Sequence, residues 1–423
     1  MVCAEILRSK FVDGDSQCAW PHGCGARPSF QALGSSVQPP SRRLILAAVF
    51  SSSLGVGLIF GFQPPLIALA LSRMGYSSFA IGAVTAASLI AVILCGPFYP
   101  RAIARLGLKR CIVGGIVFAA VILLLMPLWP SVPLWLALRF IAGCALGLVW
   151  IASEIWMNSV SGTESRGTVM GIYGTVFSLG IVAGPVLLEF TGTQGAKPFA
   201  IGAACLILTL LPLAVLRRVT SAAQEFTPLR GMSGALKTAP IVMLAALVAG
   251  LVESADLTLL PLFGLHSGLD EQAALLLVAV FMAGNVVLQV PIGLLADRYG
   301  RRTLLGICAV ASCIGPLLLQ ASLSVPLLLW PLLFVWGGTL YAFYSQGVAL
   351  LGEEFAVEDL ASANTLFVMV YCFGGVIGPS VGGMAMDLWP SRGLPVLLSG
   401  AALLMLGGLA VASARGSRRQ IVG

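Results

Sequence analysis

Ionisable residues are rare inside the long apolar segments of this sequence, and those that occur there are the first candidates for chemistry. Glu253 and Asp256 lie three residues apart in one such segment, so on a helix they share a face. Burial and a neighbouring like charge both favour the proton-bound form of a carboxyl group. The pair is therefore predicted to bind and release a proton; the alternative is a pair solvated at the outer mouth of a cavity.

Arg139 lies in another apolar segment, where it begins the pattern Arg139-x-x-x-Gly143-x-x-x-Gly147. A charge at the centre of a bilayer costs about 2.5 to 3.5 kcal/mol on insertion scales. Two readings stay open: Arg139 is a functional group inside the protein, or its long side chain extends to the outer surface. Glu154, farther along the same segment, is predicted to lie at the membrane interface beside Trp156.

Uncharged polar residues in the same segments form a second set of candidates. Asn285 and Gln289 share a helix face at i,i+4 spacing, as do Tyr341 and Ser345, and Gln63 precedes a Pro-Pro pair that is expected to break its helix. Each of these side chains either lines a cavity or bonds to a neighbouring helix.

Neither a metal site nor a catalytic centre is expected. The two histidines are His22 and His266, far from the other candidates, and an intramembrane hydrolase needs a Ser/His or metal-ligand constellation. Cys18, His22 and Cys24 could hold a metal, but two short spacings are also compatible with no site at all. No Gly-x-x-x-x-Gly-Lys-Ser/Thr loop is present, which argues against a pump driven by ATP. We expect no enzyme activity, no cofactor and no metal.

The composition indicates that this chain lies in a membrane. Of the 423 residues, 58% are apolar and 10% charged, and the mean hydropathy is +0.98; soluble proteins have roughly 45 to 50% apolar and about 25% charged residues. A soluble fold is excluded. The 24 Lys and Arg against 17 Asp and Glu give a net charge of +7. These bases form short clusters between apolar runs instead of one patch, so no nucleic-acid partner is expected.

Runs of about 20 apolar residues are long enough to cross a bilayer as helices. The sequence predicts an all-α membrane protein with twelve such spans. They are expected at 44–71, 79–99, 111–128, 133–154, 168–188, 198–216, 239–263, 273–296, 303–322, 326–350, 361–386 and 394–413.

Basic residues are distributed unequally between the two ends of these spans. Leaving out residues 1–40 and Arg139, the loops on the side of the N-terminus hold seventeen Lys and Arg, and the other side holds Arg73, Lys197 and Arg392. Basic loops stay in the cytoplasm. Both termini are therefore predicted to be cytoplasmic, in a multi-pass protein of the cell (plasma or inner) membrane.

The two halves of the chain repeat each other. Ser131-Val132-Pro133-Leu134 is matched by Ser324-Val325-Pro326-Leu327, and Arg105-Leu106-Gly107 aligns with Arg298-Tyr299-Gly300, both at an offset of 193 residues. Two six-helix halves of this kind form a substrate site at their interface near the midplane. The predicted parts are a disordered tail (1–40), the N-terminal half (41–216), a cytoplasmic linker (217–238), the C-terminal half (239–414) and a basic tail (415–423).

One loop of the second half carries a specific pattern, Gly293-Leu294-Leu295-Ala296-Asp297-Arg298-Tyr299-Gly300-Arg301-Arg302. Gly293 is expected to allow close helix approach, Gly300 a tight turn, and Asp297 a contact with a helix N-terminus or an arginine. The stretch resembles the cytoplasmic loop signature of the major facilitator superfamily of secondary transporters. The resemblance implies that Asp297, with the glycines and arginines around it, forms a gate favouring the outward-open state. The first-half copy has Ala104 in place of the acid, so the gate is expected at the second copy.

A glycine and proline pattern lies in the eleventh span, Gly374-x-x-x-Gly378-Pro379-x-x-Gly382-Gly383. Glycines four apart form a smooth stripe for close helix packing, and Pro379 is expected to bend the helix. The pattern resembles the superfamily's glycine-proline motif; generic packing of small residues is the alternative. In proton-driven exporters of the superfamily the full motif is typically in the fifth span, which here keeps only Gly180, Gly184 and Pro185. The direction of transport therefore stays open.

Further stretches resemble a bacterial branch of the superfamily whose substrates are mostly unassigned: Glu154-x-Trp156-Met157-Asn158, Leu260-Pro261-Leu262 and Leu351-Gly352-Glu353-Glu354-Phe355. The sequence thus predicts a secondary active transporter of a small molecule, working by alternating access and coupled to protons. Its expected partners are that substrate, protons and the lipid bilayer, and the chain is expected to be a monomer. The alternatives are a transporter-derived membrane sensor and an uncoupled facilitator.

Overall fold

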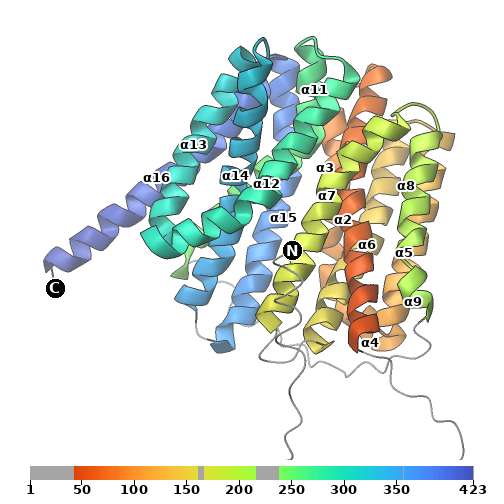
Figure 1. The fold of residues 1–423 in the computed structure, drawn as a ribbon, viewed down its shortest axis with the longest axis horizontal. Coiled ribbons are helices and arrows are strands. Elements are labelled where there is room, and N and C mark those ends of the chain that lie inside the picture. Colours follow the sequence, from red (N-terminus) through yellow and green to blue (C-terminus); the bar gives the residue numbers. More distant parts are fainter. Residues whose placement is uncertain (1–41, 161–165, 216–237, 356, 423) are drawn as a thin grey trace, which may run out of the picture. The chain divides into compact units, whose positions relative to one another are not determined.

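The computed structural model describes residues 42–160, 166–215, 238–355 and 357–422, and the regular elements in these ranges are all helical (Figure 1). The first half contains α2 (Arg42–Arg73), α3 (Ser78–Cys95), η1 (Gly96–Phe98), α4 (Tyr99–Leu106), α5 (Leu108–Leu125), η2 (Met126–Leu128), α6 (Val132–Val160), α7 (Arg166–Thr191), α8 (Lys197–Leu208) and α9 (Leu211–Val215). The second half contains α11 (Pro240–His266), α12 (Glu271–Tyr299), α13 (Arg301–Ser322), α14 (Pro326–Glu354), α15 (Val357–Leu388) and α16 (Gly393–Val422).

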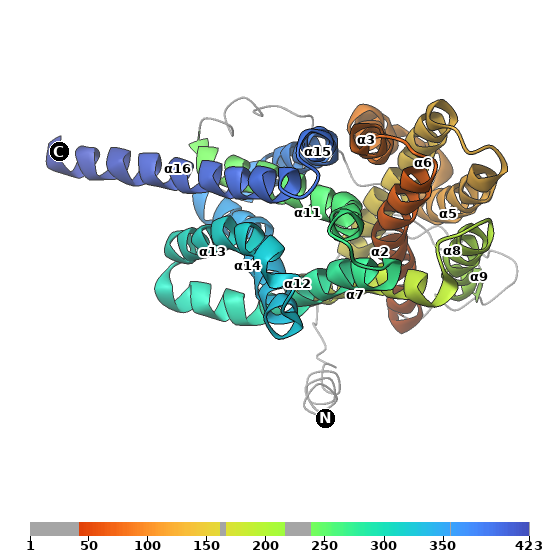
Figure 2. The ribbon, with the colours of Figure 1, turned by 90° about the horizontal axis from the view of Figure 1, so that it is seen from above.

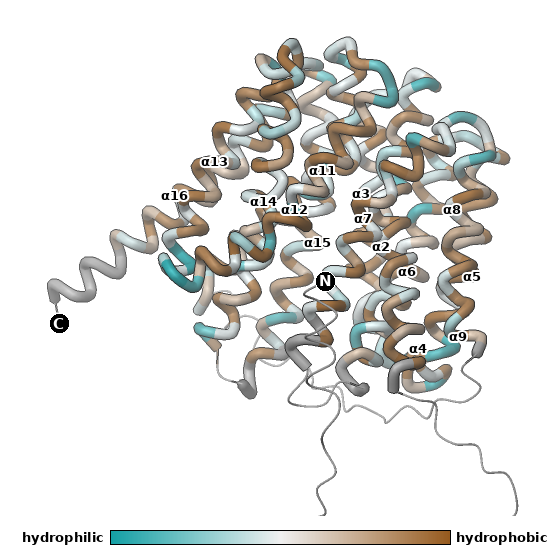
Figure 3. Tube along the Cα trace, in the orientation of Figure 1, coloured by the Kyte–Doolittle hydropathy of each residue, from teal (hydrophilic) through white to brown (hydrophobic). Residues whose placement is uncertain are grey.

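Twelve stretches of these helices are long and apolar enough to cross a membrane, which confirms the predicted all-α membrane fold. Their bounds agree with the predicted spans to within a few residues, except that the second span continues to Leu106. Figure 3 shows the apolar positions running along the helices and the hydrophilic ones gathering near the helix ends. We call the end formed by residues 74–77, 192–196, 267–270 and 389–392 the outer end, and the opposite end the inner end.

Prolines account for most of the local differences from the predicted helices. In the second span α3 ends at Cys95, and a 3-10 turn containing Pro97 leads into α4. In the sixth span α8 ends at Leu208 and α9 begins at Leu211, because Pro212 has no N–H to donate to the Leu208 carbonyl. The expected break at Pro64 and Pro65 is wrong, since α2 continues through both residues to Arg73.

Local sequence determines several helix ends. Gly107 and Gly300 end α4 and α12 with φ of 81° and 89°, a backbone region that suits glycine, and they occupy equivalent places in the two halves. Ser77 caps α3 by accepting a hydrogen bond from the Ala80 N–H, and Asp270 caps α12 in the same way through Ala273. The tight turn expected at Gly300 is therefore present.

Glycines bring equivalent helix pairs into close contact in each half. A Cβ atom placed on Gly61 of α2 would lie 2.0 Å from the Ile181 carbonyl oxygen of α7, and one on Gly250 of α11 would lie 1.9 Å from the Tyr371 oxygen of α15. Seen from above, the helices of the first half group on one side and α12, α13, α14 and α16 on the other (Figure 2). Across the interface between the halves, α3 packs against α15, α7 against α12, and α2 against α11.

Large apolar side chains occur both inside the bundle and on its surface. Phe62, Phe263 and Phe343 are fully buried, whereas Leu327 is 88% exposed. Leu327 is one of many large apolar side chains that are exposed on the surface of the bundle. Contact of so many apolar side chains with water would be unfavourable, whereas lipid is an apolar solvent for them. The exposed apolar surface therefore fits a chain surrounded by lipid.

Some predicted boundaries fall outside the described residues. The N-terminal tail and nearly all of the linker at 217–238 belong to the ranges that are not described. At the other end, α16 continues to Val422, so most of the stretch predicted as a basic tail is helical. Its last part projects away from the other helices (Figures 1 and 2).

Candidate functional site

A cavity of about 540 Å³ lies between the two halves. Pockets of 300 to 1,000 Å³ are typical of small-molecule sites. Its wall extends from mid-depth residues such as Gln63 and Leu257 towards the inner end, where Asn364 lines it seven residues after the start of α15. The lining comes from both halves, as expected for a site at the interface of two repeats.

Glu253 and Asp256 of α11 occupy different surroundings although they share a helix face. Glu253 lines the cavity, and its Oε2 atom accepts a hydrogen bond of 2.8 Å from the Tyr371 hydroxyl of α15. Asp256 is fully buried, and neither of its carboxyl oxygens has a hydrogen-bond partner among the described residues. Asp256 is thus not solvated at an outer mouth, and it stands behind the cavity wall.

Arg139 points into the bundle instead of extending to the outer surface. It is 4% exposed and lines the cavity. One Nη atom donates to Gln63 Oε1 of α2, and the other donates to Ser88 Oγ of α3 at 2.9 Å and to the Thr85 carbonyl at 3.5 Å. The ion pairs found among the described residues do not include Arg139. The guanidinium therefore ties three helices of the first half together through neutral acceptors.

The uncharged candidates also reach the cavity. Asn285 and Gln289 of α12, Tyr341 and Ser345 of α14, and Gln63 of α2 all belong to its lining. Asn285 is buried, and its side-chain oxygen has no hydrogen-bond partner in the described part of the chain. A buried amide oxygen without a partner is costly, so this atom is available to a polar group of a bound molecule.

Glu154, which the sequence predicts at the membrane interface beside Trp156, is in the cavity wall. Its Oε1 atom accepts a hydrogen bond of 2.8 Å from the Trp150 indole, one turn earlier on the same face of α6. The position of Glu154 near the end of its span suggested the membrane interface. Glu154 lines the cavity because it lies on the face of α6 that also carries Trp150.

Of the aromatic side chains of the cavity wall, Tyr341 was a candidate from the sequence, and the others were not singled out. Phe60, Trp150 and Phe177 pack against one another in the first half, with centroids about 6 Å apart. Tyr341, Tyr344 and Tyr371 form an aromatic group in the second half. Aromatic residues are common in any membrane helix, so composition alone gave no signal. The internal repeat does contain a signal for these residues. Positions 150, 173 and 177 are aromatic, and so are the positions 194 residues later, 344, 367 and 371.

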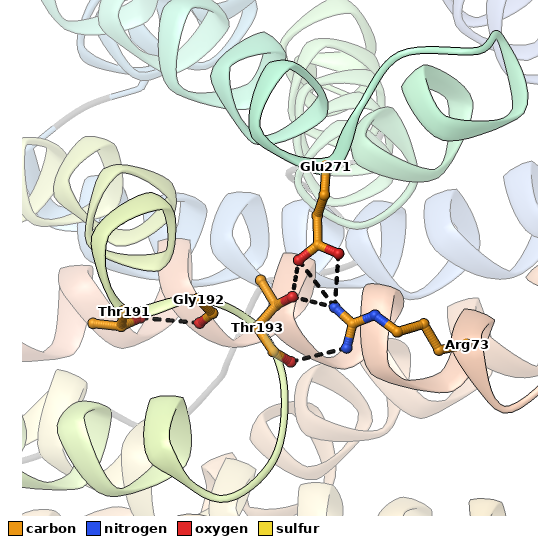
Figure 4. Close-up of polar contacts among 5 residues, drawn as sticks. All are labelled: Arg73, Thr191, Gly192, Thr193 and Glu271. Atoms are coloured by element: carbon orange, nitrogen blue, oxygen red, sulfur yellow. Dashed lines mark hydrogen bonds and ion pairs between the residues drawn. The ribbon is translucent and has the colours of Figure 1, made fainter.

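Polar contacts join the two halves at the outer end of the bundle. Figure 4 shows Glu271, at the start of α12, directed at Arg73 of α2 and at Thr193. Arg73 Nη2 lies 3.0 and 3.1 Å from the two carboxylate oxygens of Glu271, and its Nη1 donates to the Thr193 carbonyl at 3.0 Å. This cluster connects residues 198 positions apart in the chain.

A second link at the outer end uses a helix N-terminus. Asp387, near the end of α15, accepts hydrogen bonds from the backbone N–H groups of Ser78 at 2.7 Å and Phe79 at 2.9 Å. These are the first N–H groups of α3, which have no partner within their own helix. Gln272 of α12 also donates to Glu189 of α7 at 2.7 Å. The outer end is thus held closed by contacts from three helix pairs.

The loop pattern at 293–302 has a different set of contacts. Arg301 donates to Asp297 at 2.9 Å and to Glu353 at 2.7 Å, and Arg302 donates to Glu354 at 2.7 Å. Arg298 lies over the Tyr299 ring at 5.5 Å. All of these contacts stay within the second half.

The glycines of the two motifs differ in their surroundings. A Cβ atom on Gly293 would meet no described atom within 4 Å, so the close helix approach expected there is absent. In α15, a Cβ on Gly374 or Gly378 would lie 2.1 or 2.0 Å from carbonyl oxygens of α11, and one on Gly383 would lie 2.2 Å from the Ser78 oxygen of α3. A Cβ on Gly382 would lie 2.6 Å from a Leu259 side-chain carbon. The structure thus places the stripe that includes Pro379 against helices of both halves.

Among the described residues, no group of three His, Cys, Asp or Glu side chains is placed to hold a metal ion. The Cys18, His22 and Cys24 trio lies outside those residues.

Comparisons with known proteins agree with this architecture. A model of the Major Facilitator Superfamily matches residues 45–280 and 242–420. An uncharacterized MFS-type transporter of Bacillus subtilis, YfkF, is 25% identical over 348 residues, covering 80% of this chain and 88% of its own. YcaD of Escherichia fergusonii, another uncharacterized MFS-type transporter, is 23% identical over 86% of this chain and 93% of its own.

Two solved structures share the fold. The nucleoside transporter NupG superposes with a TM-score of 0.72 at 19% identity, covering 87% of this chain and 98% of its own. A bacterial homologue of the human lysosomal transporter Spinster gives a TM-score of 0.67 at 16% identity, covering 90% of this chain and 94% of its own. The family match spans both halves, and the twelve helices have the corresponding arrangement. The chain therefore belongs to the major facilitator superfamily and is a multi-pass membrane transporter of the inner membrane.

Proposed function

We propose that this protein is a secondary active transporter that moves a small molecule by alternating access and couples that movement to protons through Glu253. The observation that carries the proposal is the cavity of about 540 Å³ between the halves, with Glu253 in its wall. A carboxyl group that lines a substrate cavity in a membrane is expensive to keep and is a functional candidate by default.

The contacts at the outer end support alternating access. The Arg73, Thr193 and Glu271 cluster and the Asp387 cap hold the halves together at that end, while the cavity lining extends towards the inner end. Opening to the outside requires these contacts to break. With seventeen basic residues on the inner side, we place the inner end in the cytoplasm, so that this conformation faces inward. We expect the protein to act as a monomer, because its cavity is built from one chain.

Asp256 and Arg139 are the proposed partners of Glu253 in coupling. Asp256 is buried next to Glu253 on the same helix and lacks a hydrogen-bond partner among the described residues. Burying an ionised carboxylate without a partner costs several kcal/mol, which supports a carboxyl group that holds a proton until its surroundings change. Arg139 lines the same cavity as Glu253, and its guanidinium is the second proposed partner in the coupling.

The test uses the full chain in proteoliposomes that enclose a pH-sensitive dye. A panel of nucleosides, sugars, amino acids, organic acids and aromatic amines is added outside; nucleosides are included because the neighbour NupG is a nucleoside transporter. At least one solute is expected to change the internal pH and to show exchange across the membrane. In Glu253→Gln we expect the pH change to vanish while exchange of the same solute continues.

Other outcomes separate the alternatives. Exchange without any pH change in the wild type identifies an uncoupled facilitator. Unchanged proton movement in Glu253→Gln removes Glu253 from the mechanism. If no solute of the panel moves in either assay, the transporter proposal is contradicted in favour of a membrane sensor derived from a transporter.

A further inference from the structure

The cavity has two aromatic walls that are related by the internal repeat. Trp150 corresponds to Tyr344, and Phe177 corresponds to Tyr371, each at an offset of 194 residues. The Trp150 and Phe177 rings stack with centroids 6.2 Å apart, and the Tyr344 and Tyr371 rings meet edge to face at 5.1 Å. All four residues line the cavity. Each half therefore presents the faces or edges of a packed aromatic pair to the same space.

The two carboxyl groups of the cavity break this symmetry. Glu154 corresponds to Val348 in the second half at the same offset, and Glu253 corresponds to Phe60 in the first half at an offset of 193. All four of these side chains also line the cavity. Since an apolar residue occupies the equivalent position in the other half, the packing of the repeat does not require a carboxyl group. The two acids are additions to the cavity, not parts of the fold.

Each carboxyl group is attached to the aromatic wall of its own half. Trp150 Nε1 donates to Glu154 Oε1, and the Tyr371 hydroxyl donates to Glu253 Oε2, both at 2.8 Å. These bonds orient one oxygen of each carboxylate and keep the acid beside the rings. A negative group next to aromatic faces is the arrangement that attracts an organic cation, because the face of an aromatic ring is itself electron-rich.

Arg139 does not reverse this preference. Its Nη atoms donate to Gln63, Ser88 and the Thr85 carbonyl, and the side chain is 4% exposed. Its Nε atom has no partner among the described residues, so an anion at Arg139 is the rival reading. Either ion would share the cavity with two acids, two sets of rings and one arginine already engaged by neutral acceptors. The two acids and the ring faces attract a cation, and they repel an anion.

We propose that the transported substrate is an organic cation with an aromatic or flat apolar body, held between the Trp150 and Tyr344 walls with its charge at Glu154 and Glu253. This inference rests on the proposed transport function and adds the substrate class. The walls supply apolar and cation–π contact, and the two acids supply the counter-charge.

The test compares two ions of the same shape and opposite charge, tetraphenylphosphonium and tetraphenylborate. Binding of each radiolabelled ion to the purified full chain in detergent is measured by equilibrium dialysis, with protein-free micelles subtracting partition into detergent. We expect saturable binding of the cation and none of the anion. Equal binding of both ions, or binding of the anion alone, overturns the proposal.

Variants assign the binding to this cavity. Glu253→Gln and Tyr344→Leu are each expected to weaken binding of the cation by roughly 2- to 30-fold, the range of one cation–π or ion contact. Tyr344→Phe, which keeps the ring, is expected to recover much of the loss seen in Tyr344→Leu. Trp389→Leu is the matched control, because Trp389 is a 60% exposed aromatic residue at the outer end. Wild-type affinity in both Glu253→Gln and Tyr344→Leu, each with a normal elution volume, contradicts the proposal.

The result can be separated from the outcome of the transport assay. Exchange of a neutral solute in proteoliposomes, with no saturable binding of tetraphenylphosphonium, overturns the substrate class and leaves the proposed transport intact. Saturable binding of the cation by a chain that moves no solute supports the ligand class of the cavity and contradicts transport of that ligand.

Discussion

At the scale of single residues, Arg139 makes the most testable contacts. Its planar guanidinium bonds to Gln63 in one direction and to Ser88 in another, a fork that the single ammonium of lysine does not reproduce. Arg139→Lys is therefore expected to leave a buried acceptor without a partner, at a cost of about 1 to 3 kcal/mol. The measurement is the midpoint of thermal unfolding in detergent, which should fall.

The matched control for this prediction is Arg392→Lys. Arg392 is exposed in an outer loop, where its backbone N–H donates to the Trp389 carbonyl. Its unfolding midpoint should equal that of the wild type. A midpoint for Arg139→Lys that also equals the wild type would show that the lysine ammonium satisfies the same acceptors.

Residue types indicated most of the polar candidates but not their surroundings. Glu253, Arg139 and Gln289 were found from the sequence because polar groups are rare in apolar spans, and all three line the cavity. Glu154 was placed at the membrane interface because it lies near the end of its span. Its true surroundings depend on which face of α6 packs inward, and an almost uniformly apolar helix gives no periodic signal for that face.

At the scale of helices, the approach of α3 to α15 near the outer end gives a second prediction. A Cβ atom on Gly82 would lie 2.0 Å from the Pro379 carbonyl oxygen, and a backbone atom cannot move aside as a flexible side chain does. Gly82→Ala is thus expected to destabilise the protein by about 1 to 3 kcal/mol, the usual cost of overpacking. The thermal unfolding midpoint in detergent should fall.

Gly114→Ala in α5 provides the comparison. A Cβ atom there would meet no described atom within 4 Å, and alanine favours a helix by about 1 kcal/mol over glycine. This variant should be as stable as the wild type or more stable. If both variants behave alike, the close approach of α3 to α15 does not limit stability.

Helices themselves were predictable because their signal is local. A run of about 20 apolar residues must form a helix in lipid, since backbone N–H and C=O groups find no water there. Prolines were less predictable: the Pro64 and Pro65 pair stays within α2, whereas Pro212 accompanies a break. Neighbouring helices decide whether a helix continues past a missing hydrogen bond.

At the scale of the whole molecule, the cluster of Arg73, Thr193 and Glu271 predicts how the two conformations are balanced. Partly exposed ion pairs contribute about 0.2 to 1 kcal/mol, so Glu271→Arg should shift the population towards an open outer end by roughly 1.5- to 5-fold beyond any added repulsion. The double variant Arg73→Glu with Glu271→Arg should restore part of the closed population, because it rebuilds a pair of opposite charges.

The measurement is the labelling rate of a cysteine in the cavity wall by an impermeant maleimide added at the outer side. Leu257→Cys in an otherwise cysteine-free chain is suitable, since Leu257 lines the cavity and is buried. Labelling should be faster in Glu271→Arg and slower again in the double variant. Equal rates in all three chains would show that the cluster does not hold the outer end closed.

The sequence by itself determined the membrane environment, the twelve spans, the repeat of two halves and the loop pattern of the superfamily, because each depends on residues close together in the chain or on a fixed offset. Only the tertiary structure decided that Asp387 caps α3 across 309 residues, that Glu154 lines the cavity, and that aromatic pairs of the two halves form its walls. These features depend on how apolar helices rotate and pack against one another. In a span that is apolar on every face, the periodicity of apolar residues does not show which face packs inward. The contacts with neighbouring helices determine that face.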